Sequence, residues 1–177
     1  MEEELYIRIP TVEDEKIVME ARAEFLEVES RIPGAGSLEK IENYAEWLEK
    51  VIKDLSAETV PAGRVPSTQY LTFRKADDKL VGFVQLRHNI DIEHLAKYGG
   101  HIGDSIRPTE RNKGYATKQI ALAVQQAKNL GIEKVLITCK DWNTASARTI
   151  IKNDGVLENE ITDSEGVKYK RFWIEVK

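Results

Sequence analysis

The sequence predicts one domain of mixed α/β class in a chain of 177 residues. Two early segments carry apolar residues at helical spacing, and later segments show short alternating stretches separated by turn residues. Between about residues 101 and 130, a strand, a basic turn and a helix follow one another. No linker, repeat or low-complexity segment divides the sequence, so the expected domain spans residues 1–177.

The first elements are a strand over 5–9, ended by Pro10, and a helix that follows the N-cap candidate Thr11. Asp14 stands three residues after Thr11, as in a capping box. Apolar residues then recur at helical spacing at Ile17, Val18, Ala21, Phe25 and Val28. A second amphipathic helix is predicted over 38–55, between loops at 32–37 and 60–67.

The rest of the chain alternates strands with helices. The predicted elements are strands at 69–74, 80–87, 101–106, 135–139, 156–161 and 168–176, and helices at about 116–130 and 143–155. The strand at 135–139 is continuously apolar, which is typical of a buried parallel strand. The segment 90–98 is ambiguous, with a short helix as one interpretation.

Composition narrows the setting. Hydrophobic residues make up 41% and charged residues 32% of the chain, and no apolar run reaches membrane-spanning length. The acidic start, Met1–Glu4, is unlike a signal peptide, and the single Cys139 excludes an internal disulfide, so we expect a cytoplasmic protein with no membrane partner. The net charge of −4 argues against a nucleic-acid partner and is compatible with a cationic amine ligand.

The turn between residues 106 and 117 has the chemistry of an anion site. Free N–H groups at a helix start point outward, and the helix dipole favours negative charge there. Three positive side chains stand in the turn, at Arg107, Arg111 and Lys113. Small residues at Gly114 and Ala116 allow a ligand to approach the backbone, so a phosphate-bearing cofactor is expected.

The spacing of this turn selects among phosphate-binding motifs. It matches neither a Walker loop nor a dinucleotide fingerprint. The pattern Arg111-x-x-Gly114-x-Ala116 resembles the pyrophosphate loop of the GCN5-related N-acetyltransferases (GNAT family), Arg/Gln-x-x-Gly-x-Gly/Ala. The alternative is an ordinary basic strand-to-helix turn. The apolar strand and the helix opened by Asn143 agree with the family, and the resemblance covers about residues 99–155.

The resemblance implies a mixed, mostly antiparallel sheet of six to seven strands, with a splayed central parallel strand pair and about four flanking helices, the acyl-CoA N-acyltransferase fold. Coenzyme A would lie in the gap of the splayed pair. The implied activity is acetyl transfer from acetyl-CoA, as co-substrate, to a primary amine of a small molecule or peptide. The alternative is a non-catalytic acyl-CoA-binding regulatory or sensor module. The acceptor and the oligomeric state, with a homodimer as one option, stay open.

The resemblance also assigns residues to the cofactor. They are the strand end, the turn, the helix start and Asn143: Ser105, Ile106, Arg107, Arg111, Asn112, Lys113, Gly114, Tyr115, Ala116, Thr117 and Asn143. For Asn143, a contact with the pantetheine arm and a role as helix N-cap have equal claim. A backbone N–H from Ser105–Ile106 is the expected donor to the oxyanion.

His101 is the candidate base, because the family often places its base or water relay on this strand and a histidine titrates near neutral pH. Strand alternation places it on one face with Gly99 and Gly103, and Asp104 on the other. The alternatives for His101 are a hydrogen-bonded structural role or an exposed position.

The family's usual acid is missing from its expected position. Many members carry a Tyr seven residues after the Asn, and here that position is Ile150. The substitutes to test are Tyr98, Ser146 and Cys139, or solvent. The three His lack the tight spacing of a metal site, so no metal is expected. Trp47 is expected in the core, and Trp142 has equal claim to surface and pocket mouth.

Overall fold

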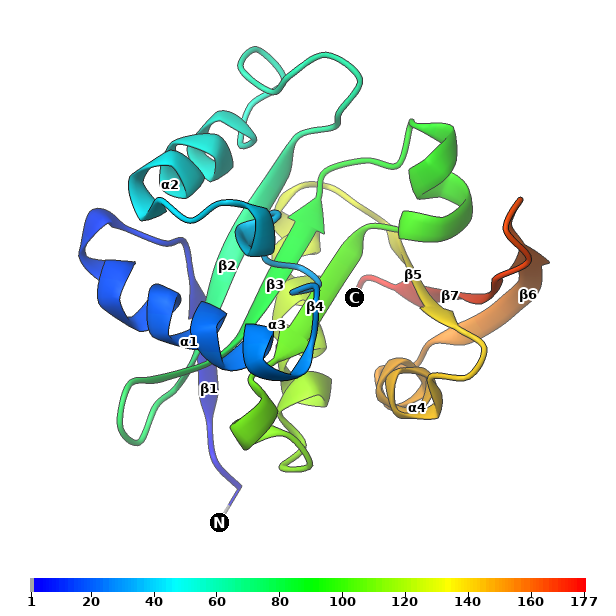
Figure 1. Ribbon diagram of the computed structural model, residues 1–177. Coiled ribbons are helices and arrows are strands. Elements are labelled where there is room, and N and C mark those ends of the chain that lie inside the picture. Colours follow the sequence, from blue (N-terminus) through cyan, green and yellow to red (C-terminus); the bar gives the residue numbers. More distant parts are fainter. Residues whose placement is uncertain (1) are drawn as a thin grey trace.

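The computed structural model describes residues 2–177, which is the whole predicted domain apart from Met1. Its seven strands form two antiparallel sheets that share one central layer (Figure 1). The strands are β1 (Leu5–Arg8), β2 (Ser67–Arg74), β3 (Lys79–Arg87), β4 (Ile102–Ile106), β5 (Lys134–Lys140), β6 (Val156–Thr162) and β7 (Lys168–Glu175). The first sheet has the order β1-β2-β3-β4 and the second the order β5-β7-β6.

Four α-helices and four shorter helical turns connect these strands. The helices are α1 (Glu15–Val28), α2 (Tyr44–Lys53), α3 (Tyr115–Asn129) and α4 (Thr144–Lys152), and the turns are η1 (Val12–Asp14), η2 (Leu38–Lys40), η3 (Leu95–Gly99) and η4 (Pro108–Glu110). Thr11 forms the predicted capping box with Asp14, although it caps η1, and α1 continues directly from that turn. The predicted start of the second helix at residue 38 was wrong. The segment from Leu38 forms η2, and Asn43 then caps α2 with a new hydrogen bond to the amide of Glu46.

The first sheet is covered on both faces because side chains on a strand alternate. Phe83 of β3 packs in a core cluster with Phe25 of α1 and Trp47 of α2. Its neighbour Val84 points the other way, into a second cluster with Ile120 of α3. Helices α1 and α2 therefore cover one face, and α3 covers the opposite face.

The two sheets meet where β4 faces β5. The helix α3 connects these strands, as a crossover between parallel strands requires. The amide of His101 donates to the carbonyl of Leu136 at 2.7 Å, which joins the sheets just before β4 begins. The two strands belong to different hydrogen-bonded sheets, so the predicted mixed fold with a splayed central pair is confirmed.

Candidate functional site

The turn after β4 ends in an open helix N-terminus. Asn112 and Gly114 both adopt left-handed backbone conformations, with φ of 63° and 80°, and Tyr115 then begins α3. No side chain of the described chain caps the first turn of α3. A Cβ placed on Gly114 would meet no atom within 4 Å. The first amides of α3 therefore point into open space, where a helix N-terminus favours an anion.

Arg107 does not point into this space. Its guanidinium pairs with Glu24 of α1 at 2.6 Å and also donates to the carbonyl of Leu80. Glu24 in turn accepts from the amide and the hydroxyl of Thr109, at 2.9 and 2.7 Å. These contacts make Arg107 and Glu24 a largely buried tie between α1 and the turn. The cofactor contact predicted for Arg107 stays a prediction, and the structure gives its side chain a different partner.

The other two basic side chains of the turn also have acidic partners. Arg111 pairs with Glu29 at 2.6 Å, and Lys113 pairs with Glu110 at 2.8 Å. Both cations are more than a third exposed, unlike Arg107. Glu29 is also about a third exposed, and exposed ion pairs contribute little free energy, so Arg111 can exchange this partner for a phosphate at small cost. Glu110 is buried but also pairs with Arg74 and Lys79, so it keeps two cationic partners if Lys113 turns to a phosphate.

The residues that begin α3 offer their backbone rather than their side chains. The Tyr115 side chain is buried, and its hydroxyl contacts Arg74 at 3.2 Å and also the carboxylate of Glu3. Ala116 and Thr117 are half-buried in the first turn. For these three positions the predicted cofactor contact therefore reduces to the peptide N–H groups.

The free edge of β4 offers a second set of backbone groups. The amide of Arg87 donates to His101 and that of Arg107 donates to Val81, which fixes the pairing of the antiparallel ladder between β3 and β4. Hydrogen bonding alternates along such a strand, so Ser105 turns its amide to β3. The amides of Asp104 and Ile106 face the other edge, toward β5. Of the two predicted oxyanion donors, Ile106 has the suitable direction and Ser105 does not.

His101 lies at the closed end of the gap. Its side chain is buried, and its Nδ1 accepts a hydrogen bond from the amide of Leu136 at 2.9 Å. Burial, and then the charge of Arg87, lower the pKa of His101 to about 4. A neutral ring whose Nδ1 accepts carries its proton on Nε2 and has no free lone pair for an amine proton. The base role stays a prediction, and the contact supports the structural alternative.

Two residues near His101 are packed against other elements. The small Gly103 lies against the backbone of Gly34: a Cβ on Gly34 would lie 2.3 Å from the Gly103 carbonyl oxygen. Asp104 points to the opposite face, as expected, where Gln119 of α3 approaches its carboxylate at 3.4 Å. Burial raises the pKa of Asp104 to about 6.

Asn143 lies at the start of α4, after the carboxyl end of β5. Its Oδ1 accepts from the amide of Ser146 at 3.1 Å, so it caps the helix. Its Nδ2 group makes no hydrogen bond within residues 2–177 and can still donate to a ligand. The capping role is confirmed, and the cofactor contact stays a prediction that is compatible with it.

The structure shows the surroundings of Ile150 and of the three side chains proposed as substitutes for the missing acid. Ile150 is fully buried in the core, so the position that carries a Tyr in many family members holds no proton donor here. Cys139 is also buried, and burial raises the pKa of its thiol. The ring of Tyr98 packs 5.2 Å from that of Tyr169 and is half-buried. Ser146 is half-buried in the first turn of α4.

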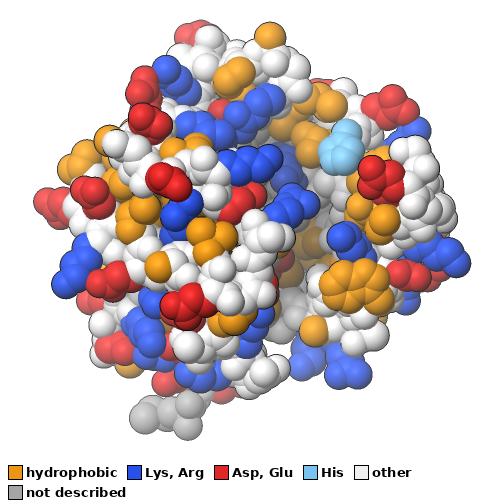
Figure 2. Space-filling model, viewed as in Figure 1, with side chains coloured by type: hydrophobic (Ala, Val, Ile, Leu, Met, Phe, Trp, Pro, Cys, Tyr) orange, Lys and Arg blue, Asp and Glu red, His pale blue; other side chains and the backbone are white. Residues whose placement is uncertain are grey.

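On the face covered by α1 and α2, the molecule has a pocket of about 400 Å³, whose strand residues are Ser67 at the start of β2 and Gln85 and Arg87 at the end of β3. Figure 2 shows Lys and Arg side chains gathered around a hollow in the middle of this side of the molecule. The lining includes residues of both predicted loops, 32–37 and 60–67. The first loop is firmly held, because Trp47 donates to the carbonyl of Ala35 at 2.8 Å and Gln69 donates to that of Gly34 at 2.7 Å. Trp47 is thus a core residue, as expected.

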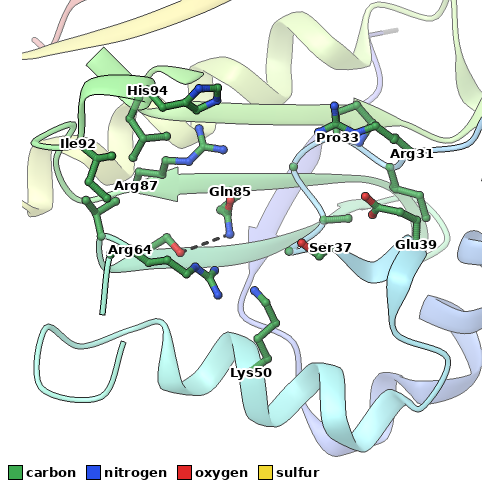
Figure 3. A pocket seen from close by; sticks show the side chains of 18 residues that line it. Arg31, Pro33, Ser37, Glu39, Lys50, Arg64, Gln85, Arg87, Ile92 and His94 are labelled. Atoms are coloured by element: carbon green, nitrogen blue, oxygen red, sulfur yellow. Dashed lines mark hydrogen bonds between the residues drawn. The ribbon is translucent and has the colours of Figure 1, made fainter. Parts of the chain in front are cut away.

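The charges of this pocket were missed at the sequence level. Its lining includes Lys50 of α2, Arg64 of the following loop and Arg87 at the end of β3 (Figure 3). The strand alternation of β3 was the available signal, because it places Gln85 and Arg87 on the same face as the buried Phe83.

Other observations limit the chemistry within the described residues. In that range no group of three or more His, Cys, Asp or Glu side chains is arranged to hold a metal ion. None of the helices described combines the length and the apolar character needed to cross a membrane. Trp142 is 70% exposed, beside the ammonium of Lys140, at the end of β5.

Several solved structures share this architecture. The spermidine/spermine N-acetyltransferase SpeG from Vibrio cholerae matches with a TM-score of 0.65 and 16% identity, over 97% of this chain and 93% of that one. RimL, a ribosomal L7/L12 protein acetyltransferase in complex with coenzyme A, matches at 0.66 and 14%, over 97% and 94%. The microcin C7 self-immunity acetyltransferase MccE, in complex with acetyl-CoA and AMP, matches at 0.67 and 16%, over 98% and 93%. These identities support a common fold.

No curated protein matches the chain by sequence. The family model described as the acetyltransferase (GNAT) domain matches residues 4–156, which include β4, the Gly114 turn and α4. The match covers most of the chain and agrees with the splayed strands and the open N-terminus of α3. The chain therefore belongs to the GNAT acetyltransferase family.

Proposed function

We propose that the protein transfers the acetyl group of acetyl-CoA to a primary amine of a small molecule or peptide. The observation that carries this proposal is the uncapped N-terminus of α3 behind Gly114, at the end of β4. Three of the structural neighbours are named for acetyl transfer, to polyamine, to a ribosomal protein or in microcin immunity.

The residues present fit a pyrophosphate. The first amides of α3 supply donors without a capping side chain, and Gly114 leaves the approach open. Arg111 and Lys113 add positive charge at the rim of the turn. The Nδ2 group of Asn143, at the start of α4, is the proposed donor to the pantetheine arm, while its carbonyl oxygen caps the helix.

Acyl transfer from a thioester has three physical requirements. The amine must be neutral to attack, the oxyanion needs a hydrogen-bond donor, and the thiolate has to leave. The amide of Ile106, on the free edge of β4, is the proposed donor to the oxyanion. A thiol with a pKa near about 8.5 is a tolerable leaving group, so solvent can protonate it in place of the absent Tyr.

The proton of the amine needs a separate assignment. His101 accepts it only if its contact with Leu136 breaks, because Nδ1 is otherwise engaged. The arrangement favours an amine that reaches the site already neutral; the nitrogen becomes positively charged on attack and then loses one of its two protons to solvent. Variants at His101 distinguish a base from a structural residue.

The test is thiol release from acetyl-CoA in the presence of a panel of primary amines, together with calorimetric titration of coenzyme A. Amine-dependent thiol release supports the proposal. Tight binding without turnover would instead support a non-catalytic acyl-CoA-binding module, which the buried Ile150 at the usual acid position favours. Absence of coenzyme A binding would overturn both.

A further inference from the structure

The pocket at the end of β3 carries an excess of positive charge, although the chain has a net charge of −4. Arg31, Lys50, Arg64 and Arg87 line it, and Glu39 is the carboxylate among its lining residues. The cations come from α2, from the end of β3 and from two loops, so the fold alone brings them together. The partners of each charge show which of them are free to bind a ligand.

Arg87 lacks an acidic partner within residues 2–177. Its Nη1 donates to the carbonyl oxygens of Gly99 and Gly100, at 3.1 and 3.0 Å, which orient the guanidinium but do not neutralise it. The residue is half-buried at the floor of the pocket (Figure 3). Burial, and then the nearby charge of Arg64, lower the pKa of Arg87. A partly buried guanidinium without a counter-charge is stabilised by a bound anion.

Lys50 and Arg64 share a single carboxylate. Both contact Oδ2 of Asp54, at 2.9 and 2.8 Å, and Asp54 is itself almost completely buried. One negative charge therefore faces two positive ones at this wall. Figure 3 shows Arg64, Arg87 and Lys50 turned toward the same part of the pocket.

The opposite wall carries the only carboxylate of the lining among the described residues, with Arg31 on the same side of the pocket (Figure 3). Glu39 lies across the pocket from Arg64 and Arg87, next to Ser37 (Figure 3). Its Oε2 is buried and has no hydrogen-bond partner among the residues that the structure describes. A carboxylate in this position suits the amine end of a ligand whose anionic end lies against the arginines. The Gln85 amide between the two walls adds a neutral polar group.

From this arrangement we infer that the acceptor is a small amine that also carries an anionic group, a carboxylate or a phosphate, which Arg87, Arg64 and Lys50 hold. This inference rests on the proposed acetyl transfer and adds the class of acceptor. A volume of about 400 Å³ fits a small molecule or the end of a peptide. The net charge of the whole chain is compatible with a cationic acceptor, but the local charge of the pocket decides which ligand binds there. The positive pocket therefore favours an acceptor with an anionic group over a purely cationic one.

The test compares amines that differ in one charge. Glycine is paired with glycinamide, and phosphoethanolamine with ethanolamine, and spermidine serves as a polycation. We expect kcat/KM for the anionic member of at least one pair to exceed that of its neutral partner by about tenfold or more, which corresponds to ~1.4 kcal/mol. The pair that shows the larger ratio distinguishes carboxylate from phosphate.

Variants link the preference to the pocket. Arg87→Gln should remove most of the ratio, mainly by raising KM for the anionic amine, and Lys50→Gln should reduce it. The matched control is Lys128→Gln, which removes the same charge from the exposed C-terminal turn of α3 and should leave the ratio unchanged. Equal or better use of the neutral amine in both pairs by the wild-type protein, or a higher kcat/KM for spermidine than for either anionic amine, would overturn the inference.

A binding measurement separates this inference from the proposed function. Calorimetric titration of the same amines is done with the acetyl-CoA site filled by coenzyme A. If the anionic amines bind the wild-type protein but not Arg87→Gln, and none is acetylated, the pocket inference survives as a binding specificity and the acetyl transfer fails. If no anionic amine binds or reacts in preference to its neutral partner, the inference fails, whatever the outcome for acetyl transfer.

Discussion

His101 and Leu136 are joined by two hydrogen bonds that link the two sheets. The amide of His101 donates to the Leu136 carbonyl at 2.7 Å, and the Leu136 amide donates to Nδ1 of the His101 ring at 2.9 Å. The side chain thus supplies an acceptor that a backbone carbonyl would supply in a continuous sheet. It stands at the closed end of the gap between β4 and β5, where the strands begin to separate.

The first prediction concerns the role of this side chain. The Oδ1 of an Asn stands close to the position of Nδ1 in a His, so His101→Asn should retain the bond to Leu136 without the basicity. We expect His101→Asn to retain kcat/KM within about tenfold, whereas general base catalysis is typically worth about 10²- to 10⁴-fold. Steady-state kinetics across neutral pH is the measurement.

His101→Ala is the control, because it removes both functions. It should lower the free energy of unfolding and loosen the edge of the second sheet. His101 is the base if kcat/KM falls by more than a hundredfold in both His101→Asn and His101→Ala while both variants fold normally. The pH profile of kcat/KM should then lose a group that titrates near neutral pH in both variants.

The second prediction is a pH dependence of stability. The pKa of His101 falls from the usual 6.5 to about 4 in the folded protein, so the unfolded chain binds the proton more tightly. The resulting stabilisation is complete above pH 6.5 and is lost as the pH falls toward 4, with a maximum near 3 kcal/mol (~1.4 kcal/mol for each pH unit). Urea unfolding of the wild type and of His101→Asn between pH 7 and 4.5 measures it. If the free energy of unfolding depends on pH in the same way for the wild type and His101→Asn, His101 is not the source of this stabilisation.

The third prediction concerns the Gly114 turn. Gly114→Glu places bulk and negative charge where pyrophosphate is proposed to bind, so coenzyme A affinity should become undetectable by calorimetry. Gly131→Glu is a matched control at the opposite end of α3, since Gly131 also has a positive φ and open space around it. Each variant carries a similar backbone strain of roughly 1–2 kcal/mol. Equal affinities of the two variants would place the cofactor elsewhere.

The fourth prediction separates the two roles of Asn143. Asn143→Asp retains the acceptor that caps α4 but loses the amide donor, so it should weaken coenzyme A binding with little change in stability. Asn43→Asp is the control, because Asn43 caps α2 with the same 3.1 Å geometry away from the cofactor. Normal affinity of Asn143→Asp would leave capping as its sole role.

The fifth prediction concerns Arg107. Arg107→Ala leaves the largely buried Glu24 without its charged partner and should cost roughly 1–3 kcal/mol of stability, with coenzyme A affinity nearly unchanged. Arg111→Ala should show the reverse pattern, a modest loss of affinity with little loss of stability, because its pair with Glu29 is exposed. Thermal unfolding measures the stability of both variants, and calorimetric titration measures their affinity for coenzyme A. A large loss of affinity in Arg107→Ala would restore it as a cofactor ligand.

The sequence predicted the features that depend on near neighbours. A helix N-terminus, its small residues and its caps are set within a few positions, so the Gly114 turn was predicted from local spacing, and capping by Asn143 was one of its two predicted roles. Strand alternation likewise predicted that His101 and Asp104 point to opposite faces at β4. The predicted boundary at residue 38 failed because two short elements, η2 and α2, carry a continuous apolar pattern across a break.

The sequence by itself therefore determined the class of fold, the family and the place of the open helix N-terminus at which an anion is proposed to bind. Only the tertiary structure decided which charges are paired and which are free. Arg107 finds Glu24 at a separation of 83 residues, and the His101 ring finds the Leu136 amide at a separation of 35. Arg87, in contrast, meets carbonyl oxygens where a carboxylate would neutralise it. The physical reason is that periodicity records which face a side chain occupies, whereas its partner depends on how distant faces pack against each other.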